Sequence, residues 1–280
     1  MASRQQQKQR ARAARLSAEA TAARNAQRSR RAQLLSGTAL VVGIVVIAIV
    51  VISSAAGNHR PSGLATGKAR HAISGQVDSL LAGIPEHGET LGDPRARYTL
   101  TLFGDLQCPV CAALATGANL DGTAGGLPEF IARQVRPGHA KLVYRSMCTA
   151  TCNDFGQSTF DEQQAAAYAA GMQSRFWYYE ELFYHQQGAE GTRYVTQGFL
   201  SRLAGEVPGL KLRTWIKDRG DPTLLGQIQA DERNAARQLP LIDGGRGTPG
   251  LIISGPAGRH FIAESTVDYD QLKAAIRTVS

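Results

Sequence analysis

The stretch Phe103–Leu114 reads FGDLQCPVCAAL and holds two cysteines, Cys108 and Cys111, separated by two residues. It follows an apolar run, RYTLTLF at 97–103, whose β-branched and aromatic residues are typical of a buried strand. Pro109 and the apolar residues after the second cysteine indicate a helix that starts at Cys108. The first turn of a helix presents unpaired N–H groups and a partial positive charge, so we expect a lowered pKa for the Cys108 thiol.

This arrangement predicts a division of labour between the two catalytic thiols. Cys108 exchanges disulfides with another protein, and Cys111, one turn further along the same helix face, resolves the mixed disulfide. The same spacing also forms half of a zinc site, which would need Cys148 and Cys152 as its other half, or it forms a purely structural disulfide. We expect neither metal nor organic cofactor.

The N-terminal region predicts a membrane anchor. Residues 1–33 carry nine Lys or Arg and one acid, whereas the other 247 residues carry 22 basic and 22 acidic side chains. The excess charge therefore belongs to a tail, and no nucleic-acid partner is predicted. Residues 34–56 carry no charge, and a helix of that length spans roughly 34 Å, enough for a bilayer core. We expect an uncleaved signal-anchor rather than a cleaved signal peptide, because its apolar run is long.

The basic tail predicts the orientation, because the Arg-rich flank of a membrane span stays in the cytoplasm. The tail could also lie on anionic lipid. Residues 57–280 would then lie outside the cytoplasm, where disulfides form and persist. All four cysteines fall in this part. For Cys148 and Cys152, four residues apart, three interpretations stay open: a structural disulfide, a second redox pair, or two free thiols.

The outer part has the pattern of an α/β domain. Residues 57–83 read as a linker with a short helix at 73–82, and residues 84–280 as one domain. Strands are expected at 97–103, 140–147, 251–254 and 259–263, with a closing helix from Val267. A helical block at about 155–240 shows apolar residues at helical spacing, among them Met172, Phe176, Tyr179 and Phe183, which predict a packed core.

Two motifs together resemble the DsbA-like branch of the thioredoxin superfamily. The first is F-x-D-x-Q-C-P-x-C, and the second is GTPG at 247–250, which stands about 140 residues later and before an apolar strand. The resemblance implies a thioredoxin fold with an inserted helical domain, preceded here by one transmembrane helix. It also implies that Pro249 is cis and faces the cysteines, with Thr248 beside Cys108, so that this loop positions an extended substrate.

The chain departs from the family pattern at three places. Pro109 and Val110 stand between the cysteines, where oxidase members often have His, and Val donates no hydrogen bond. Leu102 stands where many thioredoxins have a buried acid that aids proton transfer. Asp105 could replace that acid or could cap the turn. A Gly-rich segment, 116–126, interrupts the helix after the cysteines and could be a loop near the site or a surface insertion.

These expectations combine into a membrane-anchored, extracytoplasmic thiol-disulfide oxidoreductase. Its partners would be exported proteins with cysteines and a membrane redox partner that resets its redox state. A reductase or isomerase on the same fold, and a non-catalytic membrane-anchored binding domain, are the alternatives. The departures leave the direction of electron flow open.

Overall fold

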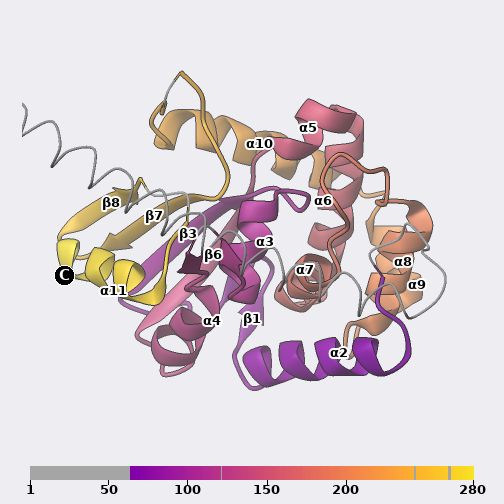
Figure 1. Cartoon of the computed structure of the whole chain (residues 1–280), viewed down its shortest axis with the longest axis horizontal. Helices are drawn as coiled ribbons and strands as arrows, with labels where there is room; N and C mark the ends of the chain where they lie inside the picture. Colours follow the sequence, from indigo (N-terminus) through magenta and orange to yellow (C-terminus); the bar gives the residue numbers. More distant parts are fainter. Residues whose placement is uncertain (1–63, 121, 243, 264–265) are drawn as a thin grey trace, which may run out of the picture. The chain divides into compact units, whose positions relative to one another are not determined.

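A six-stranded sheet forms the centre of the computed structural model, which describes residues 64–280 except 121, 243 and 264–265 (Figure 1). The strand order is β1-β2-β6-β3-β7-β8. β3 and β6 run parallel, and the other neighbouring pairs are antiparallel. The predicted α/β class is confirmed. The strands are β1 (Glu86–His87), β2 (Thr90–Leu91), β3 (Tyr98–Gly104), β6 (Ala140–Ser146), β7 (Gly250–Gly255) and β8 (Gly258–Ile262).

The two parallel strands lie in the middle of the sheet because their side chains are apolar on the faces that the helices cover. Leu102 of β3 is paired with Tyr144 of β6, and both side chains are buried. Parallel strands end at the same edge of a sheet. Cys108 follows β3 and Cys148 follows β6, so the topology brings the two cysteine pairs to one edge.

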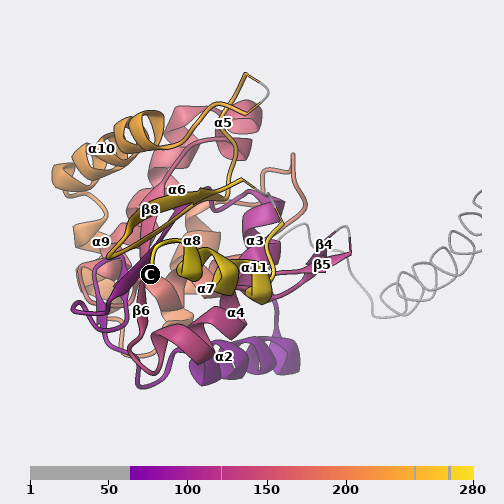
Figure 2. The ribbon, with the colours of Figure 1, turned by 90° about the vertical axis from the view of Figure 1, so that its left-hand side faces the viewer.

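Helices cover both faces of the sheet, with α10 (Pro222–Gln238) on one side and α4 and α11 on the other (Figure 2). Alternate residues of β3 face opposite ways, as strand geometry requires. Leu100 and Leu102 join the larger core, whereas Phe103 packs with Leu239 beyond α10 and with Ile252 of β7. The helices outside the inserted block are α2 (Gly67–Leu81), α3 (Pro109–Thr116), α4 (Leu127–Phe130), which continues as a π-helical turn at Ile131–Val135, and α11 (Tyr269–Thr278).

The segment between β6 and β7 is helical, as predicted. Phe176, Tyr179 and Phe183 are fully buried in its core. The prediction for Met172 is wrong: this residue follows the last turn of α6 and is 51 % exposed. The helices are α5 (Ala150–Phe155), α6 (Gln157–Gly171), α7 (Phe176–His185), α8 (Gln197–Glu206), α9 (Leu212–Asp218) and α10 (Pro222–Gln238).

Three local features differ from expectation or extend it. The helix α2 begins earlier than residue 73, at Gly67, and buries Val77 and Leu81, so part of the expected linker is structured. The turn-rich segment before β3 contains the short hairpin β1–β2. The Gly-rich segment 116–126 forms a small hairpin of its own between α3 and α4, made of β4 (Asn119–Leu120) and β5 (Thr123–Ala124).

The predicted membrane anchor at 34–56 and the basic tail at 1–33 lie outside the described residues. Within 64–280, apart from the gaps, no helix combines the length and the apolar character that crossing a bilayer requires.

Candidate functional site

Cys108 is the N-cap residue of α3, and Pro109 is its first helical residue. Proline suits that position because its missing N–H would have no partner there. The sulfur of Cys108 accepts a hydrogen bond from the backbone N–H of Cys111 at 3.4 Å. The first turn of the helix therefore directs its free donors at this sulfur. Cys108 is buried, with 5 % of its surface exposed.

The thiols of Cys108 and Cys111 are free, and their pKa values move apart. Hydrogen bonding from Cys111 lowers the pKa of Cys108 to about 7, with smaller contributions from the Thr248 side chain and from the backbone N–H groups of Cys111 and Val110. Burial acts in the opposite direction on Cys108 but does not prevail. Burial raises the pKa of Cys111, and the neighbouring Cys108 raises it further. One sulfur is thus the thiolate of the pair, and the other keeps its proton.

The loop that contains Pro249 lies against Cys108. The Thr248–Pro249 peptide bond is cis, and the thiol of Cys108 donates to the Thr248 carbonyl oxygen at 3.3 Å. The two segments meet because β7 pairs with β3 in antiparallel register, which places Gly250 opposite Phe103. The structure therefore brings Cys108, Cys111, Thr248 and Pro249 together, although they lie about 140 residues apart in the sequence.

Asp105 lies beneath this site and is completely buried. Its carboxylate accepts backbone N–H bonds from Gln107 at 3.0 Å, from Thr149 at 3.0 Å and from Thr151 at 2.9 Å. It also accepts from the Thr151 hydroxyl and from the Gln163 amide. Of the two roles considered for Asp105, the geometry supports the cap: the residue closes its own turn and the first turn of α5.

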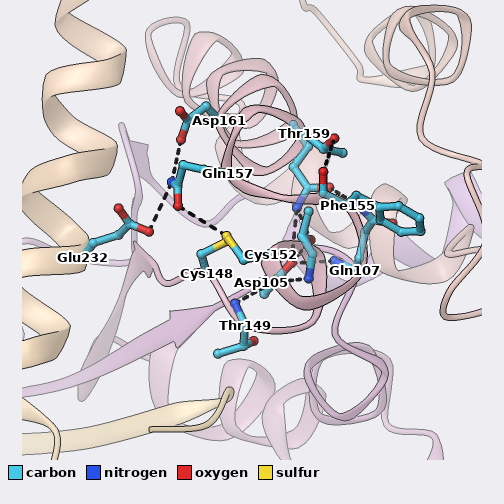
Figure 3. The surroundings of a disulfide bond; sticks show 12 residues. Asp105, Gln107, Cys148, Thr149, Cys152, Phe155, Gln157, Thr159, Asp161 and Glu232 are labelled. Atoms are coloured by element: carbon cyan, nitrogen blue, oxygen red, sulfur yellow. Dashed lines mark hydrogen bonds between the residues drawn. A yellow bond between two sulfur atoms is a disulfide. The ribbon is translucent and has the colours of Figure 1, made fainter. Parts of the chain in front are cut away.

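Cys148 and Cys152 form a disulfide at the start of α5, with their Cα atoms 5.6 Å apart (Figure 3). In this state they cannot provide the other half of a zinc site. Within the described part of the chain, no group of three or more His, Cys, Asp or Glu side chains is placed to hold a metal ion. Whether the bond is structural or exchanges electrons stays a prediction. The side-chain oxygen of Gln157 (Oε1) lies 3.3 Å from the Cys152 sulfur. The side-chain nitrogen of the same residue donates to the carboxylates of Asp161 and Glu232.

The helical insertion supports the cysteine loop through amides that sequence reasoning missed. The Gln187 amide donates to the carbonyl oxygens of Leu106 at 2.8 Å and Cys108 at 3.2 Å. The buried amides of Gln107 and Gln163 bond each other at 3.0 Å. Glutamines are common and polar, so no sequence signal distinguishes these from surface residues. Only the packing of the insertion against the loop reveals their role.

Two buried glutamates on α7 were also missed. Glu180 and Glu181 are fully buried, and no described residue donates a hydrogen bond to either carboxyl group. Burial raises the pKa of both, to about 8 for Glu181. The ring of His185 lies 3.9 Å from Glu181, but burial lowers the pKa of His185, so the two form a neutral pair at neutral pH.

A small apolar pocket adjoins the cis-proline loop. Its volume is about 80 Å³, and its lining includes Pro249, Leu239, Ile242 and Phe261. Ile242 is 47 % exposed at its rim. The Arg246 guanidinium donates to the Leu239 carbonyl oxygen at 2.8 Å and thereby ties the loop to the end of α10. The pocket offers an apolar contact within a few residues of the Thr248 backbone.

Known proteins resemble this chain in family and fold. The family described as thioredoxin matches residues 86–277. No curated protein matches the chain. Among solved structures, oxidised BdbD from Bacillus subtilis is 19 % identical, with a TM-score of 0.55, covering 71 % of this chain and 97 % of that one. Chlamydia trachomatis DsbA is 16 % identical, with a TM-score of 0.52 and coverage of 79 % and 95 %. A thioredoxin-like oxidoreductase from Silicibacter pomeroyi DSS-3 is 20 % identical, with a TM-score of 0.50 and coverage of 72 % and 95 %. These likenesses establish the DsbA-like form of the fold.

Proposed function

Because this chain belongs to the thioredoxin family, we propose that it is a thiol-disulfide oxidoreductase that acts on other proteins through Cys108 and Cys111. The observation that carries the proposal is the placement of Cys108. This thiol caps a helix, accepts the Cys111 N–H, lies 3.3 Å from the carbonyl oxygen of a cis-proline loop, and has a pKa lowered to about 7. A thiolate is the form that attacks a disulfide, so this sulfur is reactive at neutral pH.

The reaction passes through a mixed disulfide. In the reducing direction, the Cys108 thiolate attacks one sulfur of a client disulfide, a new S–S bond forms, and the other client sulfur leaves with the electron pair and takes a proton. Cys111 then loses its proton and attacks the Cys108 sulfur, which releases the second client sulfur as a thiol. The client gains two electrons, and Cys108–Cys111 becomes a disulfide. The oxidising direction is the reverse of these steps.

The client would bind as an extended segment. The Thr248 backbone lies beside Cys108 and would pair with a client peptide in the manner of an added strand. The pocket lined by Leu239 and Phe261 would take an apolar side chain next to the client cysteine. Short unfolded segments satisfy both demands better than a folded surface does.

The location is part of the proposal. The uncharged segment 34–56 and the basic residues before it support a single-pass anchor with its N-terminus in the cytoplasm and the thioredoxin domain outside. Clients would then be exported proteins, a membrane protein would reset the redox state of Cys108, and the tail would meet anionic lipid. Membrane fractionation with external protease digestion tests this: the domain should be digested in cells whose outer barriers are permeabilised, while the tail stays protected.

The Cys108 pKa does not select a direction of electron flow. A pKa of about 7 lies modestly below the value of about 8.5 for an ordinary thiol, so the thiolate stabilises the reduced form only modestly, and the redox potential decides between oxidase and reductase. Equilibration of the full-length chain with glutathione measures the potential. A value of about −120 mV would support an oxidase, whereas a value of about −270 mV would support the reductase alternative.

Activity assays decide between an enzyme and a binding domain. The full-length wild-type chain should reoxidise a reduced, unfolded ribonuclease or reduce insulin, and Cys108→Ser should reduce the rate to background. Cys111→Ser should instead accumulate the mixed disulfide at Cys108, which non-reducing electrophoresis detects. Equal rates in wild type and Cys108→Ser would overturn the enzymatic proposal and leave the non-catalytic alternative.

A further inference from the structure

The loop that carries the second disulfide reaches the cis-proline loop through one side chain. The hydroxyl oxygens of Thr149 and Thr248 lie 2.5 Å apart, although 99 residues separate them in the sequence. Thr248 is also the residue whose carbonyl oxygen faces Cys108. The chain of contacts therefore runs from the loop at 148–152, through Thr149, to Thr248 and the reactive sulfur.

We propose that Thr149 is a positioning residue whose hydroxyl holds the Thr248 hydroxyl toward Cys108, and that the Cys148–Cys152 disulfide keeps Thr149 in that place. This inference rests on the proposed function and deepens it, because it assigns the second cysteine pair a role in tuning the first. Thr149 itself touches neither the client nor the reacting sulfurs.

Thr149 is held from both sides. Its backbone N–H donates to the Asp105 carboxylate at 3.0 Å, and Asp105 also binds the Thr151 backbone N–H at 2.9 Å. The disulfide closes the same five residues into a ring whose ends are 5.6 Å apart at Cα. With its backbone fixed in this way, Thr149 has little freedom except rotation of its side chain. Figure 3 shows the backbone nitrogen of Thr149 directed at Asp105, with the disulfide above them in this view.

The direction of the hydrogen bond decides the chemical effect. When Thr149 donates to Thr248, the Thr248 hydroxyl keeps its own proton for the Cys108 thiolate, and hydrogen bonding from the Thr248 side chain favours that thiolate. The Thr248 carbonyl oxygen cannot do this, because it accepts from the thiol form and repels the anion. A donor chain from Thr149 to Thr248 to Cys108 therefore stabilises the charged sulfur.

The other groups around Cys108 do not replace this donor. The Cys111 side chain, on the same helix, makes the hydrogen bond that lowers the pKa of Cys108 most. Tyr184 of α7 is close enough to interact electrostatically with Cys108, but its hydroxyl donates to the Asp105 carbonyl oxygen at 3.3 Å. The Asp105 carboxylate is turned away into the turn at 149–151. Loss of the Thr149 hydroxyl is thus not compensated by a neighbour.

The test is the pH profile of alkylation at Cys108 in the full-length chain, read by mass spectrometry of the Cys108 peptide. Thr149→Val removes the hydroxyl and keeps the shape of the side chain. We expect its profile to shift upward by about half to one pH unit, which corresponds to a three- to tenfold loss of thiolate well below the pKa. The redox potential should become more negative in parallel.

Two variants serve as controls. Thr149→Ser keeps the hydroxyl and should restore the wild-type profile. Thr159→Val makes the same chemical change on α6, where the hydroxyl donates to the Phe155 carbonyl oxygen at 3.4 Å, and should leave the profile unchanged. An unchanged or downward-shifted profile in Thr149→Val would overturn the inference. A wild-type midpoint of about 8.5, the value of an ordinary thiol, would instead overturn the proposed function.

The role of the disulfide is tested by combining variants. Cys148→Ser/Cys152→Ser should raise the Cys108 midpoint in the wild-type background and add little in the Thr149→Val background, because both changes act through Thr149. Equal shifts in both backgrounds, or none in either, would overturn the role assigned to the disulfide. If the double variant fails to fold, mild reduction of the second disulfide in the wild type, followed by the same alkylation, gives the same comparison.

Discussion

Two cysteine pairs follow two neighbouring parallel strands, and a helix begins at each pair. The pairs differ in which group accepts hydrogen bonds from the backbone N–H groups at the start of that helix. After β3, the N-cap of α3 is Cys108 itself, and the Cys111 N–H points at its sulfur. After β6, the N-cap of α5 is Thr149, and the N–H groups of Thr149 and Thr151 point at the Asp105 carboxylate. The sulfur of Cys108 accepts an N–H group of its helix, whereas the N–H groups of Thr149 and Thr151 donate to Asp105 and not to the second cysteine pair.

The difference teaches that a cysteine at a helix start is not reactive by position alone. A helix N-terminus has only a few free N–H groups, and they stabilise whichever anion they reach. In this chain the Asp105 carboxylate accepts from N–H groups at the start of α5, whereas an N–H group at the start of α3 donates to Cys108. The same Asp105 closes the turn before Cys108, through the Gln107 N–H, so one buried side chain organises both regions.

The largest expected effect comes from removing that side chain. Asp105→Ala leaves buried N–H donors without an acceptor in both regions, and we expect a loss of about 3 to 5 kcal/mol in the free energy of unfolding. Urea denaturation measures it. Asp154→Ala, on the exposed side of α5, is the matched control and should cost little. A similar loss in both variants would mean that Asp105 does not organise the two regions.

Glu181 extends the comparison, because it is a buried carboxyl group to which no described residue donates a hydrogen bond. Its pKa of about 8 lies above the ordinary value of 4.5. The folded state therefore keeps a proton that the unfolded chain loses above pH 4.5, and stability falls as the pH rises from about 5 to 8. Glu181→Gln should reduce this fall and stabilise the protein at pH 8 by about 2 kcal/mol or more. Parallel stability curves for wild type and variant between these pH values would contradict the assignment.

The second disulfide should matter less to the chemistry than to stability. Cys148→Ser/Cys152→Ser opens a short ring and should lower the free energy of unfolding by about 2 kcal/mol. The rate of disulfide exchange should fall by less than tenfold, since Cys108 and Cys111 remain. Thermal unfolding and insulin reduction measure the two effects. Loss of all exchange in a folded double variant would break the comparison, because the second pair would then carry electrons itself.

The smallest expected effect is a direct contrast between the two pairs. After full reduction at pH 7, Cys108 should react with iodoacetamide about tenfold faster than Cys148 or Cys152. A thiol with a pKa of about 7 is half ionised there, whereas an ordinary thiol is ionised to a few per cent. Fragment-ion mass spectrometry of the peptides that contain these three cysteines gives the rates in one sample. Equal rates would show that the helix donors do not distinguish the pairs.

The sequence predicted a large part of the fold because local patterns encode it. Apolar runs marked β3, β6, β7 and β8, and Pro109 after a cysteine marked the start of α3, since proline fits the first turn of a helix and few other helical positions. The hairpins β1–β2 and β4–β5 escaped prediction, because two-residue strands leave no periodic pattern. The likeness of two distant motifs to a known family supplied the pairing of Cys108 with the Thr248–Pro249 loop.

What the sequence by itself determined is the identity and order of the reactive groups: two cysteines at a helix start, a Thr-Pro step before a strand, and a second cysteine pair in the same domain. Only the tertiary structure decided which group each donor serves. In the folded chain the N–H groups at the start of α5 donate to Asp105, and the hydroxyls of Thr149 and Thr248 bond each other. The Gln187 amide donates to the Cys108 carbonyl oxygen. Hydrogen bonds between segments tens of residues apart depend on how elements pack, and no local pattern records that packing.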